Sequence, residues 1–176
     1  MAEVLSASAQ TLVSAVLIEP EAIASEVPRD SGLYAWWASP SILPEFDGPA
    51  HGSDTSVRLV YVGLATNLRR RLQGNHMRRS GQSTLRRTLA GLLLDELMLR
   101  TRRQADRVVL LDQDEARLTS WMTEHLRLSW CIHPSPREVE ADVIRTLGPP
   151  LNVDHATGPT RDVVVAARER YRHSAD

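Results

Sequence analysis

The fold is decided by the stretch VRLVYVGLATNLRRRLQGNH, residues 57–76. It begins with apolar residues rich in Val and Leu, continues through Tyr61-Val62-Gly63, and ends with three consecutive arginines after Asn67. β-Branched and aromatic residues favour a strand. Asn67 is a suitable N-cap, because its side-chain oxygen can accept a hydrogen bond from a free N–H of the first helical turn. The stretch therefore predicts a strand followed by a helix that ends at about His76.

These arginines belong to a strongly basic central third of the chain. All 21 basic residues are arginine, and 22 acidic residues bring the net charge to -1. Residues 58–107 hold twelve arginines against three acidic residues, whereas residues 1–57 hold one against eight. A coding bias explains the choice of Arg over Lys but not this clustering. The cluster is what an anion-binding or nucleic-acid-binding face requires, and a solvated helix face is the alternative.

The composition is that of an ordinary soluble protein, with 42% hydrophobic and 24% charged residues among 176. The single cysteine, Cys131, excludes an internal disulfide and fits a reducing cytoplasm. The N-terminal apolar run is preceded by Glu3 and by no basic residue, which argues against a secretory signal. No apolar run approaches the ~20 residues that span a bilayer. We therefore expect one compact cytoplasmic domain without a membrane partner.

Other stretches carry further helix and strand patterns. Apolar residues recur at helical spacing within 5–17, after a cap at Ser83 or Thr84, from Asp114, and from Pro136 to Gly148. Apolar, aromatic or β-branched runs predict strands at 32–37, 108–112 and 128–132, and the Pro- and Gly-rich residues 38–56 predict a long loop. A few strands among several helices predict an α+β fold around a small sheet.

Four residues could together hydrolyse a phosphodiester, which requires a deprotonated water, a neutralised phosphate and a stabilised leaving oxygen. A tyrosine, an arginine and a carboxylate that holds a divalent cation can divide these tasks. The chain offers Tyr34, Tyr61, Arg71 and Glu140 among other residues of these types, and the chemistry alone would not select these four. Each of them alone has an ordinary structural explanation, since strand tyrosines usually pack and helix arginines are usually solvated.

The order of these residues resembles the GIY-YIG nuclease family over about residues 28–154. Gly32-Leu33-Tyr34 matches the first half of the family name, and Tyr61-Val62-Gly63 matches the second. Arg71 follows Tyr61 by ten positions, as the family's catalytic arginine does. Glu140 lies on the helix that carries the family's metal-binding glutamate, and Asn152 of PPLN matches the asparagine that often closes the module.

The resemblance implies a small central antiparallel sheet flanked by helices, and hydrolysis of DNA phosphodiesters with one Mg²⁺ or Mn²⁺ ion. It divides the chain into an N-terminal helical extension (1–27), a nuclease-like domain (28–155) and a polar C-terminal tail (156–176), which either frays or forms a short Arg-rich helix. Gly32, Gly63 and Asn152 are then structural, and Glu140, rather than Glu138, holds the metal.

The resemblance also implies roles for the reacting side chains. Arg71 would contact the scissile phosphate, and Tyr34 would activate or position the water, with Tyr61 as the alternative. Many members carry His or Tyr four residues after the arginine, where this chain has Asn75. Gly74 could distort the helix enough to bring in His76, and a surface histidine is the equal alternative.

Five other arginines are expected to contact flanking phosphates of DNA without reading sequence, namely Arg70, Arg78, Arg79, Arg86 and Arg87. Two other functions compete with a nuclease. One is a catalytically inert nucleic-acid-binding module that keeps the fold. The other is a protein-interaction domain anchored by an exposed Trp36-Trp37 pair. A protein partner could also supply the specificity of a nuclease.

Overall fold

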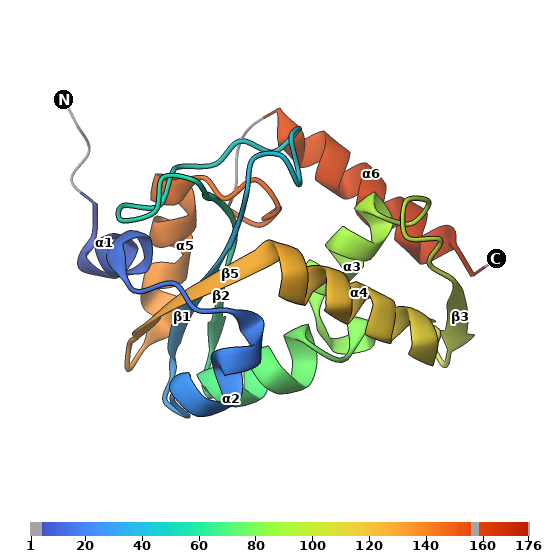
Figure 1. Cartoon of the computed structure of the whole chain (residues 1–176), viewed down its shortest axis with the longest axis horizontal. Coiled ribbons are helices and arrows are strands. Elements are labelled where there is room, and N and C mark those ends of the chain that lie inside the picture. Colours follow the sequence, from blue (N-terminus) through green and yellow to red (C-terminus); the bar gives the residue numbers. More distant parts are fainter. Residues whose placement is uncertain (1–4, 156–158, 176) are drawn as a thin grey trace.

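The computed structural model describes residues 5–155 and 159–175, and it confirms an α+β fold with a small central antiparallel sheet. Figure 1 shows the sheet strands in the middle of the molecule, with helices on both sides. The strands are β1 (Gly32–Ala38), β2 (Arg58–Ala65), β3 (Thr101–Gln104), β4 (Arg107–Leu110) and β5 (Leu126–Ile132). The longer helices are α1 (Ala7–Ser14), α3 (Thr84–Leu92), α4 (Asp112–His125), α5 (Pro136–Leu147) and α6 (Thr160–His173). Short helical segments are η1 (Pro20–Ala22), α2 (Ile23–Glu26), η2 (Arg70–His76) and η3 (Ser80–Gln82).

The central sheet has the order β2-β1-β5, with both pairs antiparallel. In the β1–β2 register, Tyr34 lies opposite Gly63 and Trp36 lies opposite Tyr61. The pairing then shifts so that Trp37 faces Leu59, which leaves Val60 as the extra residue of a β-bulge. Because side chains alternate along a strand, this register puts both tyrosines on one face of the sheet.

The two faces of the sheet have separate apolar cores. Tyr34, Trp36 and Tyr61 pack in the core that also contains buried residues of η2, α3, α4 and α6. Leu33, Ala35 and Trp37 pack with α1 and α5, which lie together on the left of the sheet in Figure 1. The prediction of an exposed tryptophan pair is therefore wrong. Trp36 and Trp37 are both 0% exposed, because β1 is the central strand and is covered on both faces.

The helix expected over residues 67–76 begins as predicted and then widens. The Oδ1 atom of Asn67 caps it by accepting a hydrogen bond of 2.9 Å from the N–H of Arg70. From Arg70 the segment η2 is a π-helix, in which hydrogen bonds join residues five apart rather than four. In this wider turn, the residue five positions after Arg71 lies above Arg71, where an α-helix would place the residue four positions after it. That residue is His76, and it is 0% exposed.

One strand was missed by the sequence-based expectation, and one of two alternatives for the C-terminal end is realised. Strand β3, which pairs with β4, was not predicted, because its residues TRRQ are polar and mostly exposed. The C-terminal end, expected either to fray or to form a short helix, forms α6 from Thr160. This helix buries Tyr171 and packs closely on α3, where a Cβ atom on Gly91 would lie 2.0 Å from the carbonyl oxygen of Ala167. Within the described residues, no helix is both long and apolar enough to cross a membrane.

Candidate active site

The two motif glycines make room for neighbouring groups of the sheet. A Cβ atom on Gly63 would lie 2.4 Å from the phenolic oxygen of Tyr34, so only glycine leaves space for the hydroxyl group there. A Cβ atom on Gly32 would lie 2.2 Å from the carbonyl oxygen of Cys131 on β5. Both glycines therefore permit close approach, and Gly63 does so directly at a candidate catalytic side chain.

Asn152 holds the outer edge of β2 beside Tyr61 and Gly63. Its Oδ1 atom accepts a hydrogen bond of 3.0 Å from the N–H of Val62, and its amide donates one of 2.9 Å to the carbonyl of Val62. These two bonds replace the strand pairing that the edge strand lacks at this residue. The asparagine after PPL thus stabilises the strand that carries the second tyrosine.

Tyr34 lies at the centre of a polar cluster built from β1, η2 and the start of α3. Its phenolic oxygen is 2.6 Å from Nε2 of His76, and the Nδ1 atom of the same ring is 2.7 Å from Oγ of Ser83. Arg71 donates from Nε to the phenolic oxygen at 3.4 Å and from a terminal nitrogen to the carbonyl of Gln82 at 2.9 Å. The ring of Tyr61 stands edge-on to His76, with centroids 6.3 Å apart.

Burial makes the ring groups of this cluster neutral. Burial raises the pKa of Tyr34 well above its usual range; the charge on Tyr61 raises it further, while Arg71 opposes the shift. Burial also raises the pKa of Tyr61. The pKa of His76 is lowered well below its usual range, first by burial and then by Arg71 and Arg86. His76 is therefore an uncharged imidazole at neutral pH.

Glu140 is the half-buried carboxylate of α5, whereas Glu138 is exposed. Burial raises the pKa of Glu140, with smaller opposing effects of His155 and Arg137. Within the described residues its side chain makes no hydrogen bond or ion pair, and no group of three or more His, Cys, Asp or Glu side chains could hold a metal. Mg²⁺ commonly binds one or two carboxylates and keeps water and phosphate as its other ligands. A single half-buried carboxylate with no described cation within ion-pair distance fits such an ion.

The model of the GIY-YIG catalytic domain matches residues 32–173. The chain belongs to the GIY-YIG nuclease family. Searches of the curated proteins and of the solved structures found no match. The match includes every element that contributes to the cluster around Tyr34, and it extends through α6.

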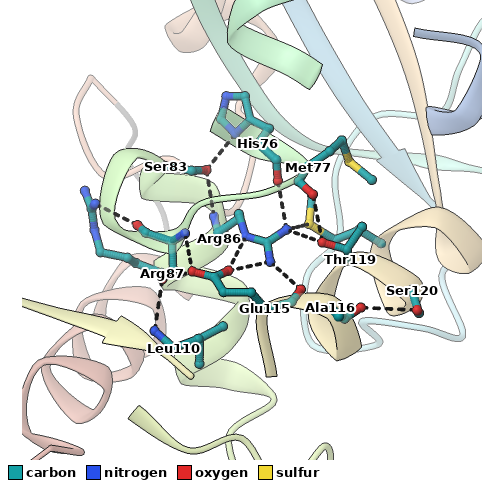
Figure 2. Close-up of polar contacts among 12 residues, drawn as sticks. His76, Met77, Ser83, Arg86, Arg87, Leu110, Glu115, Ala116, Thr119 and Ser120 are labelled. Carbon is teal, nitrogen blue, oxygen red and sulfur yellow. Dashed lines mark hydrogen bonds and ion pairs between the residues drawn. The ribbon is translucent and has the colours of Figure 1, made fainter. Parts of the chain in front are cut away.

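One expected DNA contact of this GIY-YIG domain is corrected by the structure. Arg86 is 0% exposed, and Figure 2 shows its guanidinium inside the protein beside Glu115. It donates to Oε2 of Glu115 at 2.7 Å, to the carbonyl of His76 at 3.0 Å and to Oγ1 of Thr119 at 3.0 Å. Because every one of these partners is internal, Arg86 does not contact phosphate. It fixes the end of η2 instead.

The other expected DNA contacts lie near Arg71. Arg70, Arg78 and Arg79 are exposed and line a groove together with Arg71 and the turn at η3. Arg87 is half-buried on α3. Of the predicted site residues, the structure brings Arg71 and His76 each into contact with Tyr34.

Sequence reasoning missed two contacts at the site, that of Ser83 with His76 and that of Glu115 with Arg86. Ser83 was expected as a helix cap, and it is one: its Oγ atom accepts from the N–H of Arg86 at 3.1 Å. Its second bond, to His76, follows from the π-helical turn, which the sequence did not predict. Glu115 carries no local signal, because its role depends on how α4 packs against α3.

Proposed function

We propose that this chain is a divalent-metal-dependent endonuclease that hydrolyses DNA phosphodiester bonds. The observation that carries the proposal is the phenolic oxygen of Tyr34, held between Nε2 of His76 and Nε of Arg71 at 2.6 and 3.4 Å. N–H donors on the phenolic oxygen oppose the rise in its pKa that burial causes, and a phenolate stabilised in this way when substrate is bound would accept a proton from water. A module that only binds DNA needs no such arrangement, so the inert alternative is less well supported.

Tyr34 is the better candidate for water activation than Tyr61. Within the described residues the hydroxyl of Tyr61 has no hydrogen-bond partner, whereas that of Tyr34 has two. Tyr61 lies beside the same imidazole and is suited to contact the phosphate or the water. Arg71 is fixed by the carbonyl of Gln82, which leaves the rest of its planar fork for the scissile phosphate.

Ser83 determines which nitrogen of His76 carries the proton. The hydrogen-bond chain from Ser83 through His76 to Tyr34 has two hydrogen bonds. It contains three polar hydrogens, namely those of the two hydroxyl groups and the one on the neutral imidazole, so one hydroxyl hydrogen is left over. At the Ser83 end the oxygen already accepts from the N–H of Arg86, and no described residue other than His76 offers its hydroxyl an acceptor. A buried donor without a partner costs ~1–3 kcal/mol.

We assign the remaining hydrogen to Tyr34, which is 1% exposed and whose hydroxyl would find its acceptor in bound substrate or the attacking water. Ser83 then donates to Nδ1, and Nε2–H of His76 donates to the phenolic oxygen of Tyr34. His76 acts here as a donor that stabilises the Tyr34 phenolate, and the low pKa of its ring fits this neutral role. Ser83 is a positioning residue.

Glu140 would hold the Mg²⁺ or Mn²⁺ ion. When bound, such an ion neutralises charge on the phosphate and stabilises the leaving oxygen. The exposed Arg70, Arg78 and Arg79 would contact flanking phosphates. A protein partner that supplies specificity, a cytoplasmic location and the division into extension, domain and tail remain predictions.

Cleavage of labelled duplex, single-stranded, flap and junction DNA tests the proposal, with Mg²⁺, Mn²⁺ or EDTA present. Glu140→Gln is compared with Glu138→Gln, a matched change on the exposed side of the same helix. We expect metal-dependent cleavage that Glu140→Gln abolishes and Glu138→Gln retains, with DNA binding kept by both. Binding without cleavage by the wild type under every condition would favour the inert module.

A further inference from the structure

A groove of about 710 Å³ lies between α3, β4 and α6, across the η3 turn from Arg71. Four arginines from these three elements line it, namely Arg87, Arg107, Arg168 and Arg172. Two carboxylates, Asp106 and Asp154, also line it, and Asp106 lies 4.0 Å from Arg107. The walls are thus predominantly cationic.

Two of these guanidinium groups are half-buried and fixed by neutral partners. Arg168 donates to Oγ1 of Thr88 at 2.8 Å and to the carbonyl of Leu151 at 3.3 Å. Arg87 donates to the carbonyl of Ser80 and to Oγ1 of Thr84, each at 3.1 Å. Both side chains are therefore held in place before any ligand arrives.

Neither guanidinium has a carboxylate within ion-pair distance among the described residues, and burial lowers the pKa of both. The fully buried Arg86, by contrast, is neutralised by Glu115 at 2.7 Å. A desolvated cation without a counter-ion is unfavourable unless an anion completes it. The carboxylate of Asp154 acts on Arg168 only from beyond ion-pair distance, so Arg87 and Arg168 together form a site that an anion can complete.

The groove is connected to the reaction centre. Gln82 lines it, and the carbonyl of Gln82 accepts the hydrogen bond from Arg71 at 2.9 Å. Arg168 also lies close enough to Tyr61 to oppose the rise that burial causes in the pKa of that phenol. An anion in the groove is therefore a neighbour of whatever phosphate Arg71 holds.

We propose that this groove binds the phosphates of one DNA strand next to the scissile phosphate, and that Arg168 of the C-terminal helix contacts one of them. The ligand is a nucleic-acid backbone, so this inference rests on the proposed function. Helix α6 then belongs to the substrate-binding surface of the domain. No base is read in the groove, because guanidinium contacts to phosphate carry no sequence information.

The test is binding of the 176-residue chain to labelled duplex and single-stranded DNA in EDTA, measured by fluorescence anisotropy over a range of salt. Arg168→Gln and Arg172→Gln are compared with Arg161→Gln, which removes the same charge from an exposed site on the same helix outside the groove. Arg172 makes no hydrogen bond or ion pair among the described residues, so its variant acts without loss of a structural bond. Circular dichroism verifies the fold of each variant.

We expect each groove variant to bind DNA ~3–10-fold more weakly than the wild type, and the slope of log K against log salt to fall by about 0.7–0.9. Arg161→Gln should bind like the wild type. If all three variants bind DNA equally, and the wild type still binds and cleaves DNA, the proposal that the groove binds phosphates is overturned. The proposed nuclease function would then still stand. A wild type that binds no DNA at low salt would overturn the groove as well, and its cleavage assay would decide the nuclease separately.

Discussion

Nε2 of His76 lies 2.6 Å from the phenolic oxygen of Tyr34, although the two residues are 42 positions apart in the chain. The contact joins the central strand to the last residue of the π-helical turn, and both side chains are buried. A buried phenol in contact with a neutral imidazole is the arrangement on which the chemistry of this site depends.

A donor role for His76 predicts that glutamine can replace it in part. The side-chain amide of His76→Gln offers an N–H near the position of Nε2, whereas His76→Ala offers none. We expect single-turnover cleavage to fall ~10-fold in His76→Gln and ~10²-fold or more in His76→Ala. Equal loss in both variants would instead indicate that the imidazole acts as a base.

The tautomer can be inverted from the other side of the ring. Aspartate caps a helix as well as serine does, but a carboxylate only accepts hydrogen bonds, so Ser83→Asp would draw the proton of His76 to Nδ1. We expect cleavage to fall ~10-fold, and thermal stability to fall as well because the new carboxylate is placed at a 0% exposed position. The nitrogen shifts of ¹⁵N-labelled His76 report the tautomer directly, and faster cleavage by Ser83→Asp would contradict the assignment.

Gly63 and Gly74 form a matched pair for the space around Tyr34. Gly63→Ala places a Cβ atom 2.4 Å from the phenolic oxygen, whereas nothing lies within 4 Å of a Cβ atom on Gly74. We expect Gly63→Ala to lower the free energy of unfolding by ~1–3 kcal/mol and to abolish cleavage. Gly74→Ala should leave the free energy of unfolding unchanged or raise it by up to ~1 kcal/mol. Urea denaturation measures both, and equal stability of the two variants would refute the close contact.

The pair formed by Arg86 and Glu115 should matter far more for stability than an exposed pair of the same type. Glu115→Gln leaves a fully buried guanidinium without its counter-ion, which is expected to lower the free energy of unfolding by ~3–5 kcal/mol. Asp112→Asn breaks the exposed pair with Arg102, at 3.2 Å, and should lower it by less than ~1 kcal/mol. A loss below ~1 kcal/mol in Glu115→Gln would show that the buried pair is not needed to hold η2.

Stability should also depend on pH through His76. Burial lowers the pKa of His76 in the folded chain. At a pH between this lowered pKa and the ordinary pKa of about 6.5, the unfolded chain therefore binds a proton that the folded chain does not. Stability therefore falls as the pH drops below about 6.5, by at most ~1.4 kcal/mol per pH unit for this group. His51, whose pKa burial also lowers, adds a similar effect. We expect a shallower fall in His76→Gln by urea denaturation, and curves parallel to wild type would contradict it.

The sequence predicted the features that depend on local patterns or on motif spacing. The central strands, the cap at Asn67, the helix after Pro136 and the order of the family motif all belong to this class. Strand β3 was missed because a polar, exposed strand has no apolar alternation to reveal it. Arg86 was expected at the surface because its burial depends on Glu115, 29 positions away, and no local pattern reports such a partner.

The position of His76 could be predicted only in part. The sequence offered Gly74 as a reason for distortion, but it could not decide whether the helix would widen. That outcome depends on tertiary packing, in which the ring of His76 gains Tyr34 and Ser83 as partners and the carbonyl of His76 gains Arg86.

The π-helical turn means that the histidine of this site cannot be located by counting residues from the arginine. A chain one residue shorter between Arg71 and His76 could present the same imidazole from an ordinary α-helical turn, at the spacing of four where the family resemblance implies His or Tyr. Alignments that forbid a gap at this point would place Asn75 opposite the histidine of such relatives and score the site as degenerate. A sequence comparison that includes this chain therefore has to permit one inserted residue between the arginine and the histidine, at the π-helical turn.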